Sequence, residues 1–421
     1  ADTLIEIGNS VPKDLPECNI TNKNPIKDKS LFDINSLPKS LFVPSGEKAP
    51  NRVGFSKYAS FINSFSIKKY GRPLVIAMSA DLADSTNISG FAKDFDGNND
   101  LGLFDKEKNR KSPLMPQGIT EFTNAGMLAG LTSVNLNEDP YDEFNGYFGA
   151  MSTYGSFSYL KYGPIRLFSQ LAQDSDLKVG KLIWIAGHSG PETAEDSRTH
   201  FGIFAPGVTQ LFPKGHIINL HPWEHNEVAP SLAAAMQTNI PIIALHLTRP
   251  PIEIPDRNAL GMASHLDAAK GAYIIKDYNS KKDIEGLVIV RGTSSINSLI
   301  KILPDIKSKG PNVKIIAAIS WDLFMHQSNK YRQKIISDNE WMDSMIITNG
   351  ARALMKNWIS NKIVEEYSLS PDFDNRWRTG GSVDEIVTES KLDSKSIWEG
   401  INRFAVDRKS RLDRIRQSIP L

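Results

Sequence analysis

Short runs of apolar residues, each about as long as one β-strand, recur along the chain and are separated by segments of helix length. The first four runs are Pro73–Ser79, Lys181–Ala186, Ile217–Leu220 and Ile240–Leu247. They are continuous rather than alternating, which is typical of strands whose two faces are both covered by helices. The pattern therefore predicts an α/β fold built on a mostly parallel sheet.

A second series of the same kind occupies the last third of the chain. Gly286–Val290 is a candidate strand, and Gly292-Thr-Ser-Ser supplies a turn and an N-cap for a helix at Ile296–Leu303. A Gly-Pro pair then breaks the chain before a strand at Val313–Ile319. Two strands joined through a helix imply a right-handed crossover. The sequence thus predicts two domains, each a mostly parallel sheet flanked by helices.

Proline-rich and polar stretches indicate where the domains begin and end. Residues 1–50 carry few periodic apolar positions and many Pro, Asn, Lys and Asp residues, which predicts a linker or wrapping arm. The string RPPIEIPDRN, residues 249–258, is rich in proline and predicts a domain boundary. We therefore expect one domain over residues 51–255 and a second over residues 256–421.

The composition excludes several classes of protein. The 421 residues carry a net charge of +1, so nothing indicates a nucleic-acid or membrane partner, and the longest apolar runs are too short to span a bilayer. Cys18 is the one cysteine, which rules out a disulfide within the chain and favours a reducing, cytoplasmic location. The first residues lack a signal-peptide pattern. They also begin with Ala1 rather than Met, which is compatible with processing or with a piece of a longer protein.

The densest polar cluster, HSGPETAEDSRTH at residues 188–200, directly follows the predicted strand Lys181–Ala186. Ligands of open α/β sheets bind outside the carboxyl ends of the strands, so these side chains lie where a site is expected. Composition alone favours a solvated loop, because charged loops are common. The spacing is more informative: His188 is followed by Asp196 eight positions on and by His200 four positions beyond.

This spacing resembles that of the transketolase family, whose members carry histidine, aspartate and histidine at the same intervals. Further segments resemble the family in the same order along the chain. They are Ser79-Ala-Asp-Leu-Ala-Asp-Ser85, Gly118-Ile-Thr-Glu121-Phe, Thr153-Tyr154-Gly-Ser-Phe157, Leu247-Thr-Arg249, and Ser320-Trp-Asp-Leu-Phe324 followed by Tyr331-Arg332. Each string alone is weak. Together they cover residues 52–400 and resemble only the last two domains of a transketolase, the pyrimidine-binding domain and the C-terminal domain.

The resemblance implies a binding site for half of thiamine diphosphate. Glu121 would hydrogen-bond the aminopyrimidine ring, a role that needs a buried carboxyl with a raised pKa. Tyr154 and Phe157 would form the apolar slot for this ring, and their spacing places both on one helical face. Asp81 would approach the cofactor from the partner-subunit side. From residue type alone, Glu121 is instead a helix-surface glutamate, the two aromatic residues are core, and Asp81 is a helix cap.

The resemblance also implies where the phosphate of a sugar substrate would bind. Arg249, Ser85 and His188 would hold it, and arginine is suited to bidentate phosphate contacts. Arg52 would be a second phosphate contact, although its spacing to Asp81 is longer than in the family.

Two side chains would face the donor sugar. Asp196 would accept a hydrogen bond from its C2 hydroxyl, and His200 would contact its C1 hydroxyl or the dihydroxyethyl intermediate. Glu121, His188 and His200 form the expected catalytic set. The family's Gly-Pro after the aspartate is Ser197-Arg198 here, a bulky cation in place of a rigid turn, so the preferred sugar pair stays open.

The family's metal-binding segment is missing from the sequence. Thiamine enzymes hold the diphosphate through Mg²⁺ or Ca²⁺ bound by a G-D-G…N segment on a separate domain. Asp94-Phe-Asp-Gly97-Asn98-Asn99 follows no apolar strand and predicts a surface loop. His221 and His225 in LHPWEHNE predict a helix start rather than a zinc site. The resemblance therefore implies no metal ligands on this chain. It implies a partner that carries the diphosphate-binding domain, either a separate N-terminal subunit or a fragment, and a dimer of the complete unit, which is a heterotetramer.

The expected function is a transketolase-type transferase that moves a two-carbon ketol unit from a ketose phosphate to an aldose phosphate, and only with its partner. Dihydroxyacetone synthase shares the leading histidine and is an open alternative. Deoxyxylulose-phosphate synthase and the β-subunit of a 2-oxo acid dehydrogenase are not expected to carry it. A non-catalytic paralogue is a third alternative, but assembly alone needs none of Glu121, Asp196, His200 and Arg249.

Overall fold

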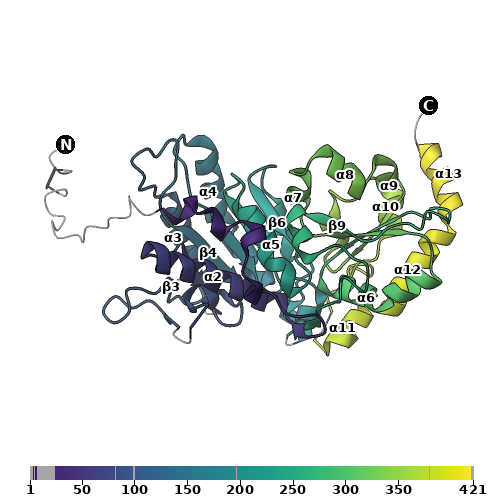
Figure 1. The fold of residues 1–421 in the computed structure, drawn as a ribbon, viewed down its shortest axis with the longest axis horizontal. Coiled ribbons are helices and arrows are strands. Elements are labelled where there is room, and N and C mark those ends of the chain that lie inside the picture. Colours follow the sequence, from purple (N-terminus) through teal and green to yellow (C-terminus); the bar gives the residue numbers. More distant parts are fainter. Residues whose placement is uncertain are drawn as a thin grey trace.

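The structure is a computed structural model that describes residues 24–80, 82–97, 100–195, 197–378 and 380–418, together with residues 3, 5 and 6. Two α/β domains lie side by side along its long axis, with the first domain on the left of Figure 1 and the second on the right. Asp81, Asp196 and most of the predicted arm before residue 24 lie outside the described residues.

The first domain is built on six parallel strands, in the order β3-β2-β4-β5-β7-β6. Their bounds are Leu114–Met115 (β3), Val75–Ser79 (β2), Phe148–Thr153 (β4), Leu182–Ala186 (β5), Ile242–His246 (β7) and Ile217–Leu220 (β6). Every residue of β2, β4, β5 and β7 is buried. The continuous apolar runs are therefore strands covered on both faces, as predicted, and the predicted bounds agree to within two residues.

Helices cover both faces of this sheet. The helices α2 (Asn51–Tyr70) and α5 (His225–Met236) pack on one face, where their apolar side chains share a core with the strands. The helices α3 (Glu121–Ser133) and α4 (Tyr162–Asp174) pack on the other face in the same way. Loops occupy the carboxyl edge of the sheet, and the predicted site residues lie at this edge.

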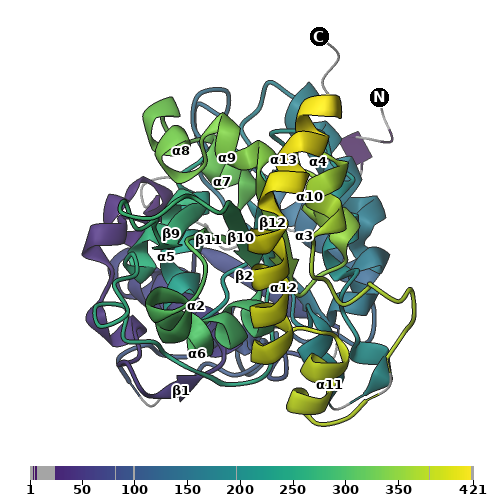
Figure 2. The same cartoon turned by 90° about the vertical axis from the view of Figure 1, so that its right-hand side faces the viewer.

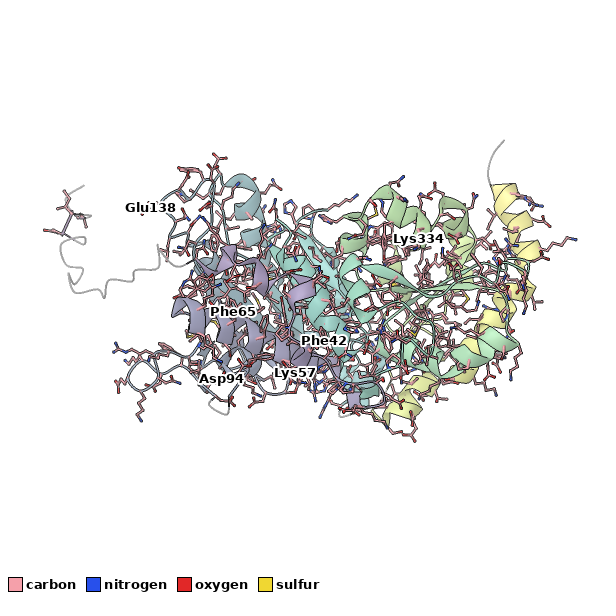
Figure 3. The ribbon with its side chains drawn as sticks, viewed as in Figure 1. Phe42, Lys57, Phe65, Asp94, Glu138 and Lys334 are labelled. Atoms are coloured by element: carbon pink, nitrogen blue, oxygen red, sulfur yellow. The ribbon has the colours of Figure 1, made fainter. Side chains whose placement is uncertain are left out.

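Residues 24–49 run over the first domain as short 3-10 turns. These are η1 (Pro25–Lys27), η2 (Lys29–Leu31), η3 (Ile34–Ser36) and η4 (Lys39–Leu41). Leu31 and Leu41 belong to the core beneath α2, and Phe42 and Phe65, labelled in Figure 3, pack against it. The segment ends in β1 (Lys48–Ala49), which pairs antiparallel with β8 (Ile252–Glu253) in the stretch between the two larger sheets.

The second domain has a four-stranded sheet in the order β12-β10-β11-β9. The bounds are Ser344–Thr348 (β12), Leu287–Arg291 (β10), Lys314–Ala318 (β11) and Ala272–Lys276 (β9). The pairs of β10 are parallel and β9 runs antiparallel to β11, so this sheet is mostly parallel, as predicted. Within the described ranges, no helix combines the length and apolar character needed to cross a bilayer.

Helices also sandwich the second sheet. On one face lie α6 (Thr293–Ser308), α12 (Ser394–Val406) and α13 (Arg408–Ser418), and Figure 2 shows the last two running across the sheet. The opposite face is covered mainly by shorter helices. They are α7 (Trp321–Met325), α8 (Asn329–Ile335), α9 (Asp338–Met342) and α10 (Lys362–Glu366). The helix α11 (Val383–Glu389) lies beside the turns after β5.

The helix that follows β10 differs from its prediction. It begins at Thr293 instead of Ile296, continues through Pro304 to Ser308, and has no side-chain cap of its own. The hydroxyls that were expected to cap it instead join the two domains. Thr293 donates to the carbonyl of Trp223, and Ser294 Oγ donates to Glu192 Oε2 at 3.0 Å. The N-cap prediction was wrong because the Glu192 carboxylate, from the first domain, accepts from the Ser294 amide in place of a local hydroxyl.

A buried ionic cluster ties the predicted boundary segment to both domains. Arg257 donates from Nε to Glu224 Oε1 at 3.0 Å and from Nη2 to Glu227 Oε1 at 2.8 Å. Both carboxylates belong to the start of α5 and are fully buried. From β9, the hydroxyl of Tyr273 donates to Glu227 Oε1 and accepts from Trp223 Nε1. The stretch between the sheets is therefore bonded to the first domain and to the second.

Candidate active site

The predicted site residues that the structure describes gather at the carboxyl edge of the six-stranded sheet. Ser85 follows β2, Tyr154 follows β4, His188 follows β5, and Arg249 follows β7. Parallel strands bring their carboxyl ends to one edge, so loops that are far apart in sequence meet there.

Glu121 is the first residue of α3 and is only 6% exposed. Its Oε1 accepts a hydrogen bond from Thr153 Oγ1 at 2.9 Å. A carboxylate in the first turn of a helix also lies close to the unpaired amides of that turn. Glu121 is therefore a buried carboxyl held at the site edge of the sheet, and the interpretation as a helix-surface glutamate is wrong.

Tyr154 links this carboxyl to the histidines, because it directly follows Thr153. Its ring centroid lies 3.9 Å from that of His188 and 4.4 Å from that of His200, both in edge-on contact. The two imidazoles lie 4.9 Å apart. The hydroxyl of Tyr154 hydrogen-bonds Ser85 Oγ at 2.8 Å. The structure thus brings four of the predicted residues into one cluster around Tyr154.

His188 is completely buried, and neither ring nitrogen has a hydrogen-bond partner within the described residues. Burial lowers its pKa to about 3, helped by the nearby His200, Arg249 and Arg52. The imidazole is therefore neutral at physiological pH, with one donor and one acceptor unused. A buried side chain with unused hydrogen-bonding capacity is suited to a polar ligand.

Two glycines let the backbone of His188 reach this position. A Cβ on Gly155 would lie 2.0 Å from the carbonyl oxygen of His188, and one on Gly202 would lie 2.2 Å from it. Any larger residue at either position would push the histidine loop away.

Two arginines give the site its positive charge. Arg52 Nη1 donates to the backbone oxygen of Ser85 at 2.8 Å, and burial followed by the charge of Arg249 lowers the pKa of Arg52. Arg249 Nε lies 3.6 Å from Glu195 Oε1. Two guanidinium groups beside neutral imidazoles and hydroxyls form a surface that can hold an anion such as a phosphate.

Tyr154 and Phe157 do not share a helical face, contrary to the prediction. Tyr154 has an extended backbone and lies just before the 3-10 helix η6 (Gly155–Lys161), which contains Phe157. Its ring turns toward the histidines, whereas Phe157 is 41% exposed. The spacing argument failed because the helix begins one residue after Tyr154. The roles of the two rings toward a cofactor stay predictions.

Sequence reasoning missed two buried charged groups beside this cluster. Lys161 at the end of η6 is buried, and its Nζ donates to the carbonyls of Ile185 at 3.2 Å and Met151 at 3.4 Å. Burial lowers its pKa, and the charge of Glu121 acts in the opposite direction. Glu192 is buried and joins the site loop to the second domain. No motif marks Lys161, and Glu192 lies in the polar string 188–200 without a role of its own being predicted; the burial of both charged groups is seen in the structure.

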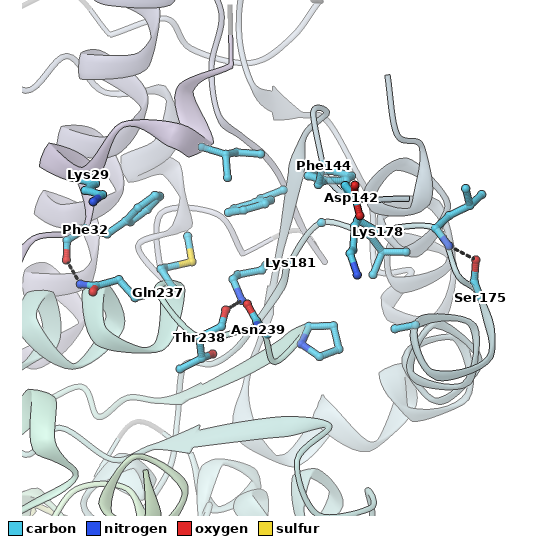
Figure 4. Close-up of a pocket in the computed structure, with 18 of the residues that line it drawn as sticks. Lys29, Phe32, Asp142, Phe144, Ser175, Lys178, Lys181, Gln237, Thr238 and Asn239 are labelled. Atoms are coloured by element: carbon cyan, nitrogen blue, oxygen red, sulfur yellow. Dashed lines mark hydrogen bonds between the residues drawn. The ribbon is translucent and has the colours of Figure 1, made fainter. Parts of the chain in front are cut away.

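A cavity of about 960 Å³ lies elsewhere (Figure 4). Its lining includes Phe148, Lys181 and Pro241, which are found where β4, β5 and β7 begin, so it opens at the amino edge of the sheet. Lys181 Nζ donates to the carbonyl of Ile240 at 2.8 Å and to that of Thr238, and burial lowers its pKa to about 8. This cavity is on the opposite edge from the cluster, and its described lining contains none of the predicted site residues.

The predicted surface loop and the histidine pair need no ligand to explain them. Asp94 and Asp96 approach Lys68 in ion pairs on the surface, and Asn98 and Asn99 lie outside the described residues. His225 is the first residue of α5, as the helix-start interpretation predicts. Across the described ranges, no three His, Cys, Asp or Glu side chains are grouped so that they could hold a metal ion.

Comparison with known sequences finds transketolases. No family model matches the chain. It is 26% identical over 269 residues to a transketolase of Nostoc sp.. The aligned residues cover 63% of this chain and 34% of that protein. It is 26% identical over 167 residues to transketolase 7 of Craterostigma plantagineum, and these residues cover 38% of this chain and 23% of that protein. The chain thus spans about a quarter to a third of the length of these relatives.

Comparison with solved structures covers more of the chain. Transketolase from Leishmania mexicana matches with a TM-score of 0.63 at 15% identity, over 90% of this chain and 49% of that one. A transketolase complex with sedoheptulose-7-phosphate from Pichia stipitis matches with a TM-score of 0.62 at 18% identity, over 90% and 50%. A split-gene transketolase, solved as an inactive β4 tetramer, matches with a TM-score of 0.50 at 14% identity, over 84% of this chain and 99% of that one. The chain is therefore homologous to transketolases at low sequence identity and shares their fold.

Proposed function

We propose that this chain is the pyrimidine-binding and C-terminal half of a transketolase-type transferase, which moves a two-carbon ketol unit from a ketose phosphate to an aldose phosphate. The observation that carries the proposal is the buried carboxyl of Glu121, hydrogen-bonded to Thr153 and adjoining the cluster of Tyr154, His188 and His200. In this assignment residues 51–255 form the pyrimidine-binding domain and residues 256–421 the C-terminal domain.

The residues of this chain fit one half of a thiamine diphosphate site. Thiamine diphosphate supplies, when bound, a carbon that can accept and release the two-carbon unit. Glu121 would hydrogen-bond the pyrimidine ring nitrogen with its buried carboxyl, which Thr153 holds at the carboxyl edge of the sheet. Tyr154 and Phe157 would flank the ring, and Asp81 would meet the cofactor from the other side of the interface.

The cationic part of the cluster fits the phosphate of a sugar. Arg249 and Arg52 supply fixed positive charge, and Ser85 a hydroxyl. His188 is neutral and has both ring nitrogens available, so it can hydrogen-bond a substrate hydroxyl or a phosphate oxygen without adding charge. His200 would contact the C1 hydroxyl, and Asp196 the C2 hydroxyl, of the donor.

An exposed apolar face beside Glu121 supports the proposal that a partner chain binds there. Seven large apolar side chains from α3, η6, α4 and the turn before α3 are each at least 41% exposed, which is unusual for neighbouring positions of one surface. They are Ile119, Phe122, Met127, Phe157, Leu160, Leu167 and Leu171. We place there a subunit or fragment that carries the diphosphate-binding domain and the Mg²⁺ or Ca²⁺ ligands. The match to nearly all of a split-gene transketolase chain agrees with such a division, and the complete unit would pair as a heterotetramer.

The experiment is a reconstituted assay. The chain is co-purified with the companion that carries the diphosphate-binding domain, and product formation from a ketose phosphate and an aldose phosphate is measured with thiamine diphosphate and Mg²⁺. The chain alone should be inactive, and Glu121→Ala should lower turnover of the complex by about a hundredfold or more. Glu138→Ala, a change at an exposed glutamate on the same domain, is the matched control. Turnover of the Glu121 variant at the level of the control would refute the proposal.

The donor specificity is tested at Asp196. Asp196→Ala should make the enzyme discriminate less between donor sugars that differ at C2, because the carboxylate that accepts from the C2 hydroxyl is gone. The ratio of kcat/KM values for two such donors measures this change, and an unaltered ratio would remove the role assigned to Asp196.

A further inference from the structure

A second cavity, of about 360 Å³, lies between the two domains. Its lining includes Asn219 from β6 of the first sheet, Arg291 from the carboxyl end of β10, and residues that follow β11. Among the residues that the structure describes, its lining includes none of those in the candidate active site. The carboxyl end of a strand in a parallel sheet is where ligands of such folds usually bind, and the volume is that of a small-molecule site.

Arg291 is the charged group most deeply buried in the wall of this cavity, at 3% exposure. Its Nη1 donates to the carbonyl of Leu354 at 3.2 Å, but Nε and Nη2 have no hydrogen-bond partner among the described residues. These two nitrogens form one edge of the planar guanidinium, and such an edge can donate hydrogen bonds to two oxygens of a single oxyanion. A buried cation with two unused donors is costly unless something binds it.

The groups around Arg291 leave the cavity positive. His221 lines the cavity and stacks on His246 at 4.5 Å, and burial together with the charge of Arg291 keeps both imidazoles neutral by lowering their pKa. Asp322 is the one carboxylate among the described lining residues, and its Oδ2 already accepts from the Asn219 backbone amide at 2.8 Å. Burial raises the pKa of Asp322, which weakens its competition for Arg291.

Two lysines stand at the open side of the cavity. Lys214 and Lys356 are exposed members of the lining, one from each domain. Exposed lysines alone do not define a site, but here they add charge at the mouth of a cavity whose floor carries the buried arginine.

We infer that this cavity is a binding site for a small phosphorylated metabolite, with its phosphoryl group at the guanidinium of Arg291 and the rest of the molecule toward Lys214 and Lys356. The site is separate from the proposed active site. Because its walls come from both domains, occupancy holds the domains together and stabilises the folded chain.

Calorimetric titration of the whole chain with inorganic phosphate tests this inference, with acetate and chloride at matched ionic strength as competing anions. We expect saturable phosphate binding that Arg291→Met weakens by about tenfold or more. Arg249→Met removes a phosphate contact of the proposed active site, and this variant should keep the Arg291-dependent binding. Lys356→Gln should weaken binding less than Arg291→Met, and Lys301→Gln, at an exposed position on α6 outside the cavity, should leave it unchanged.

A thermal-unfolding scan checks that the variants are folded. Without phosphate, Arg291→Met should melt at or above the temperature of the wild type, because a buried cation with unsatisfied donors has been removed. Should this variant fail to fold, Arg291→Lys keeps the charge but lacks the two-nitrogen edge, and is also expected to bind phosphate about tenfold more weakly. Phosphate binding that is equal in the wild type and the Arg291 variants, or equally strong binding of acetate, would overturn the inference.

Discussion

Replacing Glu224 by glutamine should make the protein more stable at high pH than the wild type. Glu224 is fully buried, and Arg257 is shared between it and a second carboxylate, Glu227. Glu224 Oε2 has no hydrogen-bond partner in the described part of the chain. Burial, which outweighs the attraction of Arg257, raises the pKa of Glu224 from 4.5 to about 7. The folded protein therefore favours the neutral acid, which glutamine resembles in shape and charge.

The sign and size of the effect follow from this shift. A carboxyl whose pKa is higher in the folded state stabilises the protein fully below pH 4.5, and this stability is lost as the pH rises toward 7. At about 1.4 kcal/mol for each pH unit, the rise from 4.5 to about 7 corresponds to a loss of about 3 kcal/mol. Glutamine cannot ionise, so the Glu224→Gln variant does not lose this free energy of unfolding as the pH rises.

Urea unfolding of both proteins at about pH 5 and about pH 8 measures the effect. The free energy of unfolding of the variant, relative to the wild type, should rise by about 2 to 3 kcal/mol between these values. Glu138→Gln removes a carboxyl from the exposed position labelled in Figure 3 and should show no such rise. A difference between Glu224→Gln and the wild type that is the same at both pH values would refute the reasoning.

Two further predictions concern packing. Gly155→Ala places a methyl group 2.0 Å from the carbonyl oxygen of His188, so the histidine loop must move. We expect reconstituted activity to fall by about tenfold or more, while the far-ultraviolet circular dichroism spectrum is retained. Unchanged activity would contradict this geometry. Leu303→Ala empties a fully buried position of α6 and should lower the free energy of unfolding by about 2 to 5 kcal/mol in urea. Leu160→Ala, at an exposed position of η6, should change it by less than about 1 kcal/mol, and equal losses in both variants would argue against the burial of Leu303.

The predicted strands are long apolar runs, but β4, β9 and β12 were not predicted, and of these three β4 has the small side chains. Lys181–Ala186 and Ile217–Leu220 are recognisable because apolar residues are continuous. The central strand β4 was not predicted, since its sequence FGAMST holds Gly149, Ala150 and two hydroxyl residues. A Cβ on Gly149 would lie 2.8 Å from Thr132 Oγ1 and 2.9 Å from Leu182 Cδ2, so small residues are required by the close approach of α3 and β5. That requirement comes from packing and leaves no apolar signal.

The sequence by itself determined the two-domain α/β architecture and placed His188 and Arg249 directly after buried strands, with His200 in the same polar string as His188. Strand length and apolar periodicity are local properties, and the carboxyl ends of parallel strands share one edge wherever the chain folds this way. The tertiary structure alone decided that Glu121 is buried against Thr153 and that Arg291 has two unused donors in the wall of an interdomain cavity. Burial and hydrogen-bond satisfaction depend here on residues tens of positions apart, and no local pattern encodes them.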